Sequence, residues 1–434
     1  MSAALSAVDA RRVTETALSG LRDEVAPPVT ARVVAAGKAA WGMAEAVMAV
    51  FGERVTAGII TTGRTREDVA AAFGRQWRAF DAGHPVPTAP SEAAGRAALS
   101  LAGDAARNRE RLVVCLSGGA SAMLAVPAAG LTIEDKARVT SALLRAGASI
   151  DELNLVRRHL SGIKGGQLAA RGLPAVASAE AGRSITLAIS DVCVPGDDDP
   201  SVIGSGPMTG AAFDPGAALA VLRRSGADGG PLMSVVRYLE RAVTRRPPDA
   251  PIAPDDRRLT GAAYFVVASR ADAMRAAAET ARRFGYLVDV RRDAITGDAR
   301  DAGRALIAAA ARSARPGCII ASGETTVVVR GQGRGGRNQE LVVAALESLA
   351  AAGPAALASV GTDGVDGPTD AAGAFADHTM WTNLGADARA ICDDALTRND
   401  TFHLLDGLGA LVRTGPTGTN VGDLQVLLLP EAGE

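Results

Sequence analysis

Glycine-rich turns that carry hydroxyl or charged side chains are the parts of this sequence best suited to chemistry. One of them, Ser117–Ser121, reads Ser-Gly-Gly-Ala-Ser and follows the apolar run Leu112–Leu116. Glycine lets a backbone approach a ligand closely, and successive N–H groups at a helix start can surround an anion. The segment is typical of a phosphate-binding turn, although a tight strand-to-helix turn without a ligand explains it equally well. Its residues are Ser117, Gly118, Gly119, Ala120 and Ser121.

A second turn places two arginines among glycines between residues 331 and 340. The β-branched run Thr325–Arg330 precedes it, and we expect that run to form a strand. The guanidinium groups of Arg334 and Arg337, with the N–H groups of a helix start, suit a phosphate or a carboxylate. We expect Asn338 to cap that helix, and the anion to lie against Gly333, Gly335 and Asn338. A solvated basic loop would explain the charges but not the glycines.

Lysine is rare in the chain, which makes the position of each lysine informative. The lysines are Lys38, Lys136 and Lys164. Lys38 follows the apolar run Arg32–Ala36 and lies in the first turn of an expected helix, where a cation opposes the helix dipole. This position favours an anion beside Lys38, while a solvent-facing lysine remains the alternative. The spacing is not that of a Walker A motif.

Two clusters of carboxylates are candidates for a metal site. Asp363, Asp366 and Asp370 fall in one Gly- and Asp-rich turn, and Asp191 precedes the run Asp197–Asp199 in another. Oxygen ligands of this kind suit Mg²⁺. Asp and Gly are also ordinary turn formers, so a structural role is equally compatible with both clusters.

The expected helix that begins at Ser149 carries polar residues at steps of three and four. Asn154, Arg157, Arg158 and Ser161 would share one face of it, and a solvated face is the default interpretation. The motif continues into Lys164, which precedes two glycines.

Composition restricts the class of protein. The formal net charge is -2, which gives no reason to expect nucleic acid or an anionic membrane as a partner. The longest apolar runs are shorter than the ~18 residues that a membrane helix needs. The four cysteines are scattered without CxxC spacing. We therefore expect a cytoplasmic protein; a homodimer is compatible with the sequence, which does not fix the oligomeric state.

Short apolar runs alternate with Ala-rich helical segments, which predicts an α/β fold with a mainly parallel sheet. A length of 434 residues favours two domains. The stretch from Arg245 to Arg258 contains four prolines and predicts a linker, so we place the domains at 1–245 and 259–434 with residues 246–258 between them. A long loop within one domain is the alternative. The expected helices include 4–25, 271–285, 298–313 and 338–351, and the expected strands include 32–36, 55–61, 112–116, 185–189, 264–268, 286–290, 318–320, 325–330, 356–360 and 424–429.

In order along the chain, these turns resemble the glycerate 2-kinase family whose C-terminal domain is called MOFRL. The matching motifs are GKAAWGMAEA (37–46), GHPVPTAPSEAAG (83–95), LSGGASAML (116–124), NLVRRHLSGIKGGQLA (154–169), SDV…PGDDDPSVIGSGP (190–207), SGETTVVVRGQGRGGRNQEL (322–341), GTDGVDGPTDAAGA (361–374) and TGPTGTNVGDLQVLL (414–428). The resemblance covers nearly the whole chain. It implies a Rossmann-like N-terminal domain, a C-terminal α/β domain and an active site in the cleft between them.

The resemblance also implies an activity and roles for residues. The expected reaction is ATP-dependent phosphorylation of D-glycerate at its 2-hydroxyl, with Mg²⁺ as cofactor. Lys38, Arg334 and Arg337 would be catalytic, and Ser117–Ser121 would hold nucleotide phosphates. We assign the substrate carboxylate to Arg157 and Lys164, and the metal to Asp191, Asp363 and Asp366.

Some positions depart from the family pattern. Ala120 stands where a third glycine is usual, Gly422 stands where Asn is commoner, and the segment before Asp197–Asp199 is longer than usual. The rival activity is an NAD(P)H-dependent hydroxypyruvate reductase, a label that members of this family also carry. The sequence lacks a clean dinucleotide-binding motif after its first strand, which counts against that activity.

Overall fold

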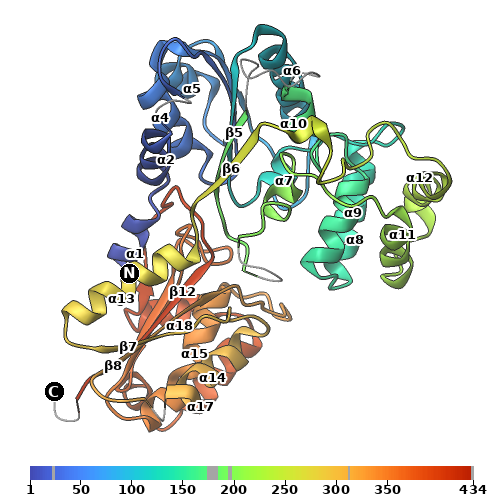
Figure 1. The fold of residues 1–434 in the computed structure, drawn as a ribbon. Coiled ribbons are helices and arrows are strands. Elements are labelled where there is room, and N and C mark those ends of the chain that lie inside the picture. The colour runs from blue at the N-terminus through green and yellow to red at the C-terminus, as the bar shows by residue number, and fades with distance from the viewer. Residues whose placement is uncertain (22–24, 174–183, 194–197, 311–312, 432–434) are drawn as a thin grey trace. The chain divides into compact units, whose positions relative to one another are not determined.

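Alternating apolar runs and Ala-rich segments build two separate β-sheets in the computed structural model (Figure 1). The structure describes residues 1–21, 25–173, 184–193, 198–310 and 313–431. The chain divides into an N-terminal unit, Ala10–Val267, and a C-terminal unit that combines residues 268–434 with Met1–Asp9. The predicted α/β class with two sheets is confirmed.

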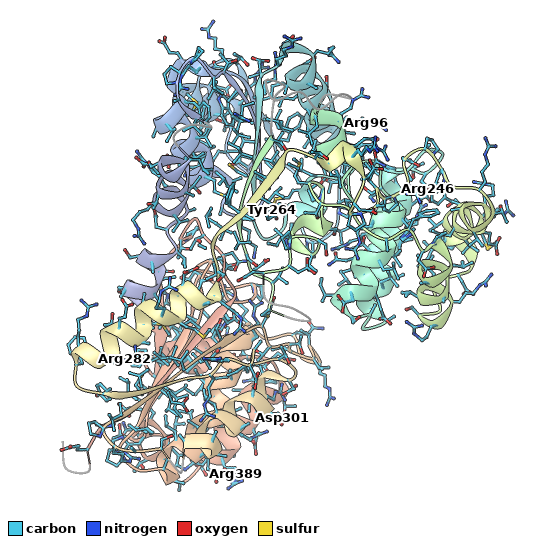
Figure 2. The ribbon with its side chains drawn as sticks, in the orientation of Figure 1. Arg96, Arg246, Tyr264, Arg282, Asp301 and Arg389 are labelled. Carbon is cyan, nitrogen blue, oxygen red and sulfur yellow. The ribbon has the colours of Figure 1, made fainter. Side chains whose placement is uncertain are left out.

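The predicted linker 246–258 lies within the N-terminal unit and is held there by backbone contacts. Ile252 N–H donates to the Gly165 carbonyl at 2.8 Å, and the Ile252 carbonyl accepts from Ala211 N–H at 2.7 Å. Arg246, labelled in Figure 2, stacks its guanidinium 4.6 Å from the centroid of the Phe213 ring. The chain passes from one unit to the other between Val267 and Ala268 instead, and also between Asp9 and Ala10.

The N-terminal sheet has the strand order β3-β2-β1-β4-β5-β6. Neighbours among β1 to β5 pair in parallel. Its central strands are buried on both faces, as parallel strands between helical layers are. The strands are β1 (Ala31–Ala36), β2 (Val55–Thr61), β3 (Trp77–Phe80), β4 (Arg111–Leu116), β5 (Ser184–Ile189) and β6 (Ala262–Ala268).

Helices cover both faces of this sheet, and a further helical group has a core of its own (Figure 1). That group consists of α8, α9, α11 and α12. Capping boxes, Thr132 with Asp135 and Ser149 with Glu152, begin α8 and α9. The helices are α2 (Ala10–Gly20), α4 (Ala40–Phe51), α5 (Arg66–Phe73), α6 (Ala89–Asn108), α7 (Ala120–Met123), α8 (Ile133–Arg145), α9 (Ile150–His159), α10 (Gln167–Gly172), α11 (Pro215–Arg224) and α12 (Met233–Thr244), with short 3₁₀ turns at Gly52–Arg54, Ile203–Ser205, Gly230–Leu232 and Arg257–Leu259.

The C-terminal sheet is mixed and has the order β11-β10-β9-β12-β8-β7. Only β7 and β8 pair in parallel among its described pairs. Its strands are β7 (Leu287–Val290), β8 (Gly317–Gly323), β9 (Ala356–Gly361), β10 (Gly373–Asp377), β11 (Leu411–Val412) and β12 (Asp423–Leu429). In Figure 1, α13 lies on one side of this sheet and α14, α15 and α17 lie on the other. The helices are α1 (Ser2–Ala7), α13 (Arg270–Arg283), α14 (Ala299–Ala310), α15 (Arg337–Ala351), α16 (Met380–Asn383), α17 (Ala388–Thr397) and α18 (Thr401–Gly407).

Two predicted elements are wrong. The helix expected over 4–25 is two helices, α1 and α2, which belong to different units. The run Thr325–Arg330 is an extended loop: Val328 and Val329 are 58% and 74% exposed, and the N–H groups of Arg330 and Gly331 donate to Asn399 Oδ1. The Asn399 side chain, rather than a neighbouring strand, accepts these two hydrogen bonds. None of the described helices is long and apolar enough to cross a membrane.

Candidate functional site

The two N-terminal turns singled out in the sequence lie side by side at the carboxyl edge of the parallel sheet. β1 ends before Gly37 and Lys38, β4 ends before Ser117, and β1 pairs with β4. Lys38 N–H donates to the Gly118 carbonyl at 2.9 Å, and Ala39 N–H donates to Ser117 Oγ at 2.9 Å. The strand order reverses at this pair, and ligands of open α/β sheets bind where the order reverses.

Gly37 is required by the closeness of these two turns. Its φ is +113°, and a Cβ there would collide with the Ser117 side chain and backbone. Lys38 is exposed and precedes α4, which begins at Ala40 rather than at Lys38. Ser117 is fully buried, so its hydroxyl fixes the turn. The N–H groups of Ser117 and Ala120 donate to the Ala36 and Ser117 carbonyls, so those of Gly118 and Gly119, with Ser121, are the candidates for contact with a ligand. The structure thus brings Lys38 and Ser117–Ser121 together; their roles stay predictions.

The helix α9 does not present the solvated polar face expected from its sequence. Asn154 is 2% exposed, and Ser161 is fully buried just beyond the helix. Arg158 Nη1 donates to the Ser201 carbonyl at 3.1 Å. The polar residues of α9 therefore face other parts of the N-terminal unit, which is a correction to the sequence interpretation.

Buried cations gather around α9. Lys164 is 1% exposed, and its Nζ donates to the carbonyls of Ser121 (2.7 Å), Gly204 (3.1 Å) and Leu124 (3.4 Å). Burial, with the charges of Lys136, Arg157 and Arg158, lowers the pKa of Lys164. Burial lowers the pKa of Lys136 to about 7 and that of Arg157 to about 10. Such a region favours an anion, because a negative charge would offset the cost of keeping these groups protonated. Arg157 and Lys164 stay predicted substrate-binding residues, although Lys164 also links three backbone segments.

In the C-terminal unit, polar side chains collect at one edge of the sheet. β8 and β9 end where β12 begins, because both pair antiparallel with it and Asp423 stands opposite Gly323 and Gly361. Arg337, the first residue of α15, donates from Nε and Nη2 to the two Asp423 oxygens at 2.6 and 2.8 Å. Its Nη1 lies 3.2 Å from Glu324 Oε1.

The Arg337–Asp423 pair is strongly shielded from water. Asp423 is 1% exposed, and burial raises the pKa of its carboxyl to about 6 even though Arg337 opposes that rise. Burial alone would lower the pKa of Arg337, but its hydrogen bonds and charge contacts with Asp423 raise it above its ordinary value. The guanidinium is therefore charged and held by two parallel hydrogen bonds. Sequence reasoning missed Asp423, whose only signal was its place in the motif 414–428.

Asp366 caps α15, which corrects the expected cap by Asn338. The helix begins at Arg337, and Asp366 Oδ1 accepts from Asn338 N–H at 3.1 Å while Oδ2 accepts from Gln339 N–H at 2.9 Å. The side-chain amides of Asn338 and Gln339 donate to the same carboxylate at 3.2 and 3.1 Å. A carboxylate at a helix N-terminus is stabilised by the exposed N–H groups and the helix dipole.

The rest of the arginine-bearing turn has its own packing. Arg334 is exposed and lies 4.7 Å from the centroid of the Phe402 ring, with its Nη2 3.3 Å from the Pro368 carbonyl. A Cβ at Gly333 or Gly335 would collide with Asp400 or Thr401. Close approach of two backbones therefore accounts for these glycines without a ligand, and their phosphate-binding role stays a prediction.

The metal roles predicted for Asp191, Asp363 and Asp366 stay predictions. Among the residues that the structure describes, no group of three His, Cys, Asp or Glu could hold a metal ion. Asp366 is occupied by α15, and Asp363 Oδ1 accepts from Val365 N–H at 3.1 Å. Asp191 lies in the other unit, after β5. Of the second acidic cluster, Asp197 lies outside the described residues.

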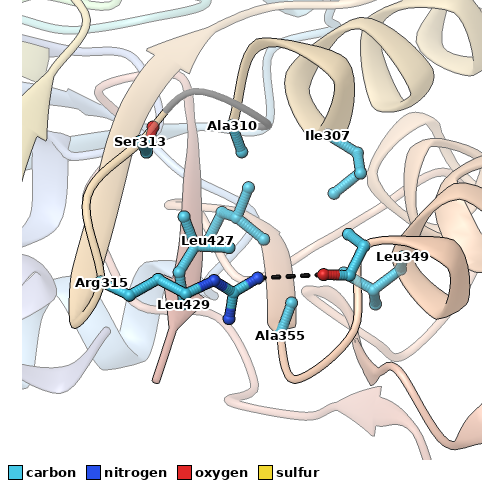
Figure 3. Close-up of a pocket in the computed structure, with 9 residues that line it drawn as sticks. Ile307, Ala310, Ser313, Arg315, Leu349, Ala355, Leu427 and Leu429 are labelled. Atoms are coloured by element: carbon cyan, nitrogen blue, oxygen red, sulfur yellow. Dashed lines mark hydrogen bonds between the residues drawn. The ribbon is translucent and has the colours of Figure 1, made fainter. Parts of the chain in front are cut away.

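A cavity of about 290 Å³ in the C-terminal unit is separate from these groups (Figure 3). It is lined mostly by apolar side chains, among them Leu427 and Leu429. Arg315 at its edge donates to the Ala352 carbonyl at 3.0 Å. The cavity lies at the end of β12, whereas Asp423 begins that strand, so the two are on the order of 15–20 Å apart.

Comparison with known proteins adds a family assignment. Residues 1–240 match the family described as Domain of unknown function (DUF4147), and residues 317–423 match the MOFRL family. The D-glycerate 2-kinase of Thermotoga maritima is 34% identical over 410 residues, which cover 92% of this chain and 90% of that protein. An Agrobacterium vitis protein that carries hydroxypyruvate reductase in its name is 37% identical over 411 residues, covering 92% and 86%. The crystal structure of a glycerate kinase from T. maritima matches with a TM-score of 0.79 at 32% identity, covering 98% of this chain and 96% of that one.

Proposed function

Because the chain belongs to the glycerate kinase family with a DUF4147 N-terminal and a MOFRL C-terminal region, we propose that it is a glycerate 2-kinase. It transfers the γ-phosphoryl group of ATP to the 2-hydroxyl of D-glycerate and releases 2-phosphoglycerate and ADP. The observation that carries this proposal is the juxtaposition of Lys38 with the turn Ser117–Ser121 where the strand order reverses.

Phosphoryl transfer requires positioning and charge neutralisation rather than covalent chemistry by the protein. In this proposal the turn Ser117–Ser121 holds nucleotide phosphates through the N–H groups of Gly118 and Gly119, because those of Ser117 and Ala120 already donate to carbonyls. Lys38 neutralises charge on the transferring group. Arg337 stabilises the same charge, and we favour it over Arg334 because Asp423 fixes its guanidinium. Arg157 binds the carboxylate of glycerate within the cationic region around α9.

Mg²⁺ accompanies ATP in reactions of this kind. Asp366 does not fit as its ligand, because four N–H donors occupy its carboxylate. Asp191 and Asp363 remain the candidates. The proposed steps involve only residues of the chain and the two substrates.

The alternative function is reduction of hydroxypyruvate, and one observation favours it. The strand order 3-2-1-4-5-6 is that of many dinucleotide-binding domains. The turn after β1, however, reads Gly37-Lys38-Ala39-Ala40, and β2 ends at Thr61 rather than at an acid that could bind a ribose. The glycines and the carboxylate that bind a dinucleotide are thus missing from their usual places, so the kinase is preferred.

The test couples the purified protein, with D-glycerate, ATP and Mg²⁺, directly to enolase without a phosphoglycerate mutase. Enolase accepts 2-phosphoglycerate and not the 3-phosphate, so a signal establishes both the reaction and its position. ADP formation without that signal indicates another hydroxyl. If no ADP forms and hydroxypyruvate oxidises NADH or NADPH, the reductase is the correct assignment.

The Lys38→Ala variant tests the catalytic assignment. We expect its turnover to fall on the order of 10³-fold, because a cation at the transferring group is lost. The matched control is Arg96→Ala, which removes a 63% exposed cation from α6 in the same unit and should leave turnover unchanged (Figure 2). Near-normal turnover of Lys38→Ala would exclude a catalytic role for Lys38.

A further inference from the structure

Three side chains of the N-terminal unit form a hydrogen-bonded chain that ends in the turn Ser117–Ser121. Ser121 Oγ and Ser205 Oγ lie 2.7 Å apart, and Ser205 Oγ donates to Asn154 Oδ1 at 2.7 Å. Ser205 is fully buried and Asn154 is 2% exposed, whereas Ser121 is half-buried. We call this set the Ser121–Ser205–Asn154 relay. Ser121, the least buried of the three residues, is the end of the relay that lies in the turn.

The direction of each hydrogen bond in the relay follows from its chemistry. The amide oxygen of Asn154 can only accept, so Ser205 must donate its single hydroxyl proton to it. Ser205 Oγ is then left with lone pairs, and Ser121 must donate its own proton to Ser205. Ser121 Oγ therefore presents only lone pairs to a ligand. It is suited to accept a hydrogen bond from a ligand hydroxyl and unsuited to bind a phosphate oxygen.

The surrounding backbone holds the relay in this arrangement. Ser205 has φ +60°, between Gly204 at +61° and Gly206 at +64°. A glycine would adopt this conformation freely, so a serine costs free energy that its buried hydroxyl must justify. Lys164 Nζ donates to the Ser121 and Gly204 carbonyls at 2.7 and 3.1 Å, which fixes the two serines relative to each other.

Asn154 contributes its oxygen rather than its amide N–H groups. Its Nδ2 atom is buried and has no hydrogen-bond partner among the residues that the structure describes. Such an unpaired donor is costly, so the side chain is explained by what its oxygen does. That oxygen sets the direction of the hydrogen bonds along the relay.

We propose that Ser121 Oγ accepts a hydrogen bond from a hydroxyl group of the acceptor substrate. Ser205 and Asn154 are positioning residues that fix the direction of the hydrogen bonds, so that Ser121 can only accept. The proposal rests on the proposed function, since it places the acceptor beside the turn Ser117–Ser121. It assigns Ser121 to the recognition of a small hydroxy acid and leaves the phosphates to the backbone N–H groups of the turn.

The experiment measures kcat and KM for D-glycerate and for ATP in the full-length protein and its variants. Ser121→Ala removes the acceptor, and we expect KM for glycerate to rise about tenfold while KM for ATP changes less than about twofold. Ser205→Gly fits the φ of +60° but cuts the relay, and it should raise the same KM. The matched control is Ser100→Ala, an exposed serine on α6 without a described partner.

Asn154 provides the second readout. Asn154→Asp keeps an oxygen that only accepts, and Arg157 and Arg158 lie three and four residues further on α9, where they favour a carboxylate. We expect KM for glycerate in Asn154→Asp to stay closer to the wild type than in Asn154→Leu. Equal defects in the two variants would overturn the positioning roles, because a merely structural asparagine would not distinguish them.

Other outcomes separate this proposal from the proposed function. If Ser121→Ala raises KM for ATP instead, or neither KM, Ser121 is not a hydroxyl acceptor. If the wild type does not phosphorylate glycerate, the kinase proposal fails and calorimetric titration with D-glycerate decides the relay. About tenfold weaker glycerate binding by Ser121→Ala would then support it. Equal binding by both proteins, or none by the wild type, would overturn it.

Discussion

Asp423 lies at the first position of β12, and both of its carboxylate oxygens accept hydrogen bonds from Arg337. These two hydrogen bonds fix the orientation of the Arg337 guanidinium and therefore the direction in which its other N–H groups point. Asp423→Asn leaves one acceptor oxygen and removes the charge. Under the catalytic role proposed for Arg337, we expect kcat to fall on the order of 100-fold, since the guanidinium is displaced. Steady-state kinetics with the enolase-coupled assay measures this.

Glu324→Gln is the matched control for that variant, because Glu324 contacts the same guanidinium but its side chain is 54% exposed. An exposed pair contributes little, so we expect kcat to change less than about threefold. Equal losses in the two variants would mean that general negative charge around Arg337 matters, rather than the two hydrogen bonds from Asp423.

Because the pKa of Asp423 is raised, we expect kcat of the wild type to depend on pH. The carboxyl takes up a proton as the pH falls through about 6, and the paired hydrogen bonds to Arg337 weaken. Wild-type kcat should therefore decline below that pH, and the kcat of Asp423→Asn should not show this decline.

The free energy of unfolding depends on pH in the opposite direction. The pKa of Asp423 in the folded protein lies above the ordinary 3.8, so its contribution to stability is full below pH 3.8 and is lost as the pH rises through about 6. Unfolding experiments from pH 4 to 7 should show the wild type losing stability relative to the variant.

The sequence indicated the candidate site residues that fall in glycine-rich motifs and missed the side chains that contact them. Lys38, Arg337 and the Ser117–Ser121 turn could be found because each follows a strand-like run. Asp423 could not, because its contact with Arg337 depends on the register of β12 against β8 and β9. Asn154 was assigned to a solvated face because periodicity identifies a polar face without telling what covers it.

At the level of elements, α15 depends on a side chain from a distant turn. Asp366→Ala would remove the carboxylate that accepts from the backbone N–H groups of Asn338 and Gln339 and from the Asn338 side-chain amide, while the Gln339 side-chain amide would keep Thr369 Oγ1 as an acceptor. We expect a loss of about 2–4 kcal/mol in the stability of the C-terminal unit. Hydrogen exchange at the amides of Asn338 and Gln339 should accelerate, with or without Mg²⁺. Asp370→Ala, which removes a 66% exposed carboxylate four residues later, should have little effect.

A metal role for Asp366 makes a different prediction. If Asp366 is chiefly a metal ligand, Asp366→Ala should leave exchange at α15 unchanged in the metal-free protein and affect only binding of Mg²⁺.

Long apolar runs could be predicted as strands, and short or exposed ones could not. β2 was predicted over its observed residues, Val55–Thr61, because it is a long β-branched run. Thr325–Arg330 is also β-branched, but the structure describes only one isolated bridge in it, between Thr326 and Asp298, and the Arg330 N–H donates to the Asn399 side chain. β11 has only two residues and forms through pairing with β10, which no local pattern signals.

At the scale of the whole molecule, the chain passes between its two units twice. α1 packs on α13 in the C-terminal unit, and Thr419 Oγ1 donates to the Val8 carbonyl at 2.7 Å. α2 begins two residues later and belongs to the N-terminal unit. The first nine residues are therefore part of the C-terminal core, although more than 250 residues separate them from it in sequence.

This arrangement predicts where a change near the N-terminus acts. Ala4 is fully buried, so Ala4→Asp places a charge in an apolar contact and should cost the C-terminal unit about 3 kcal/mol or more. Ser2→Asp adds the same charge at an exposed position of α1 and should change stability by less than about 0.5 kcal/mol. Hydrogen exchange read by mass spectrometry should accelerate in α13 and β8 of Ala4→Asp and stay unchanged in β1 and β4. Faster exchange in β1 and β4 instead would mean that the first nine residues stabilise the N-terminal unit.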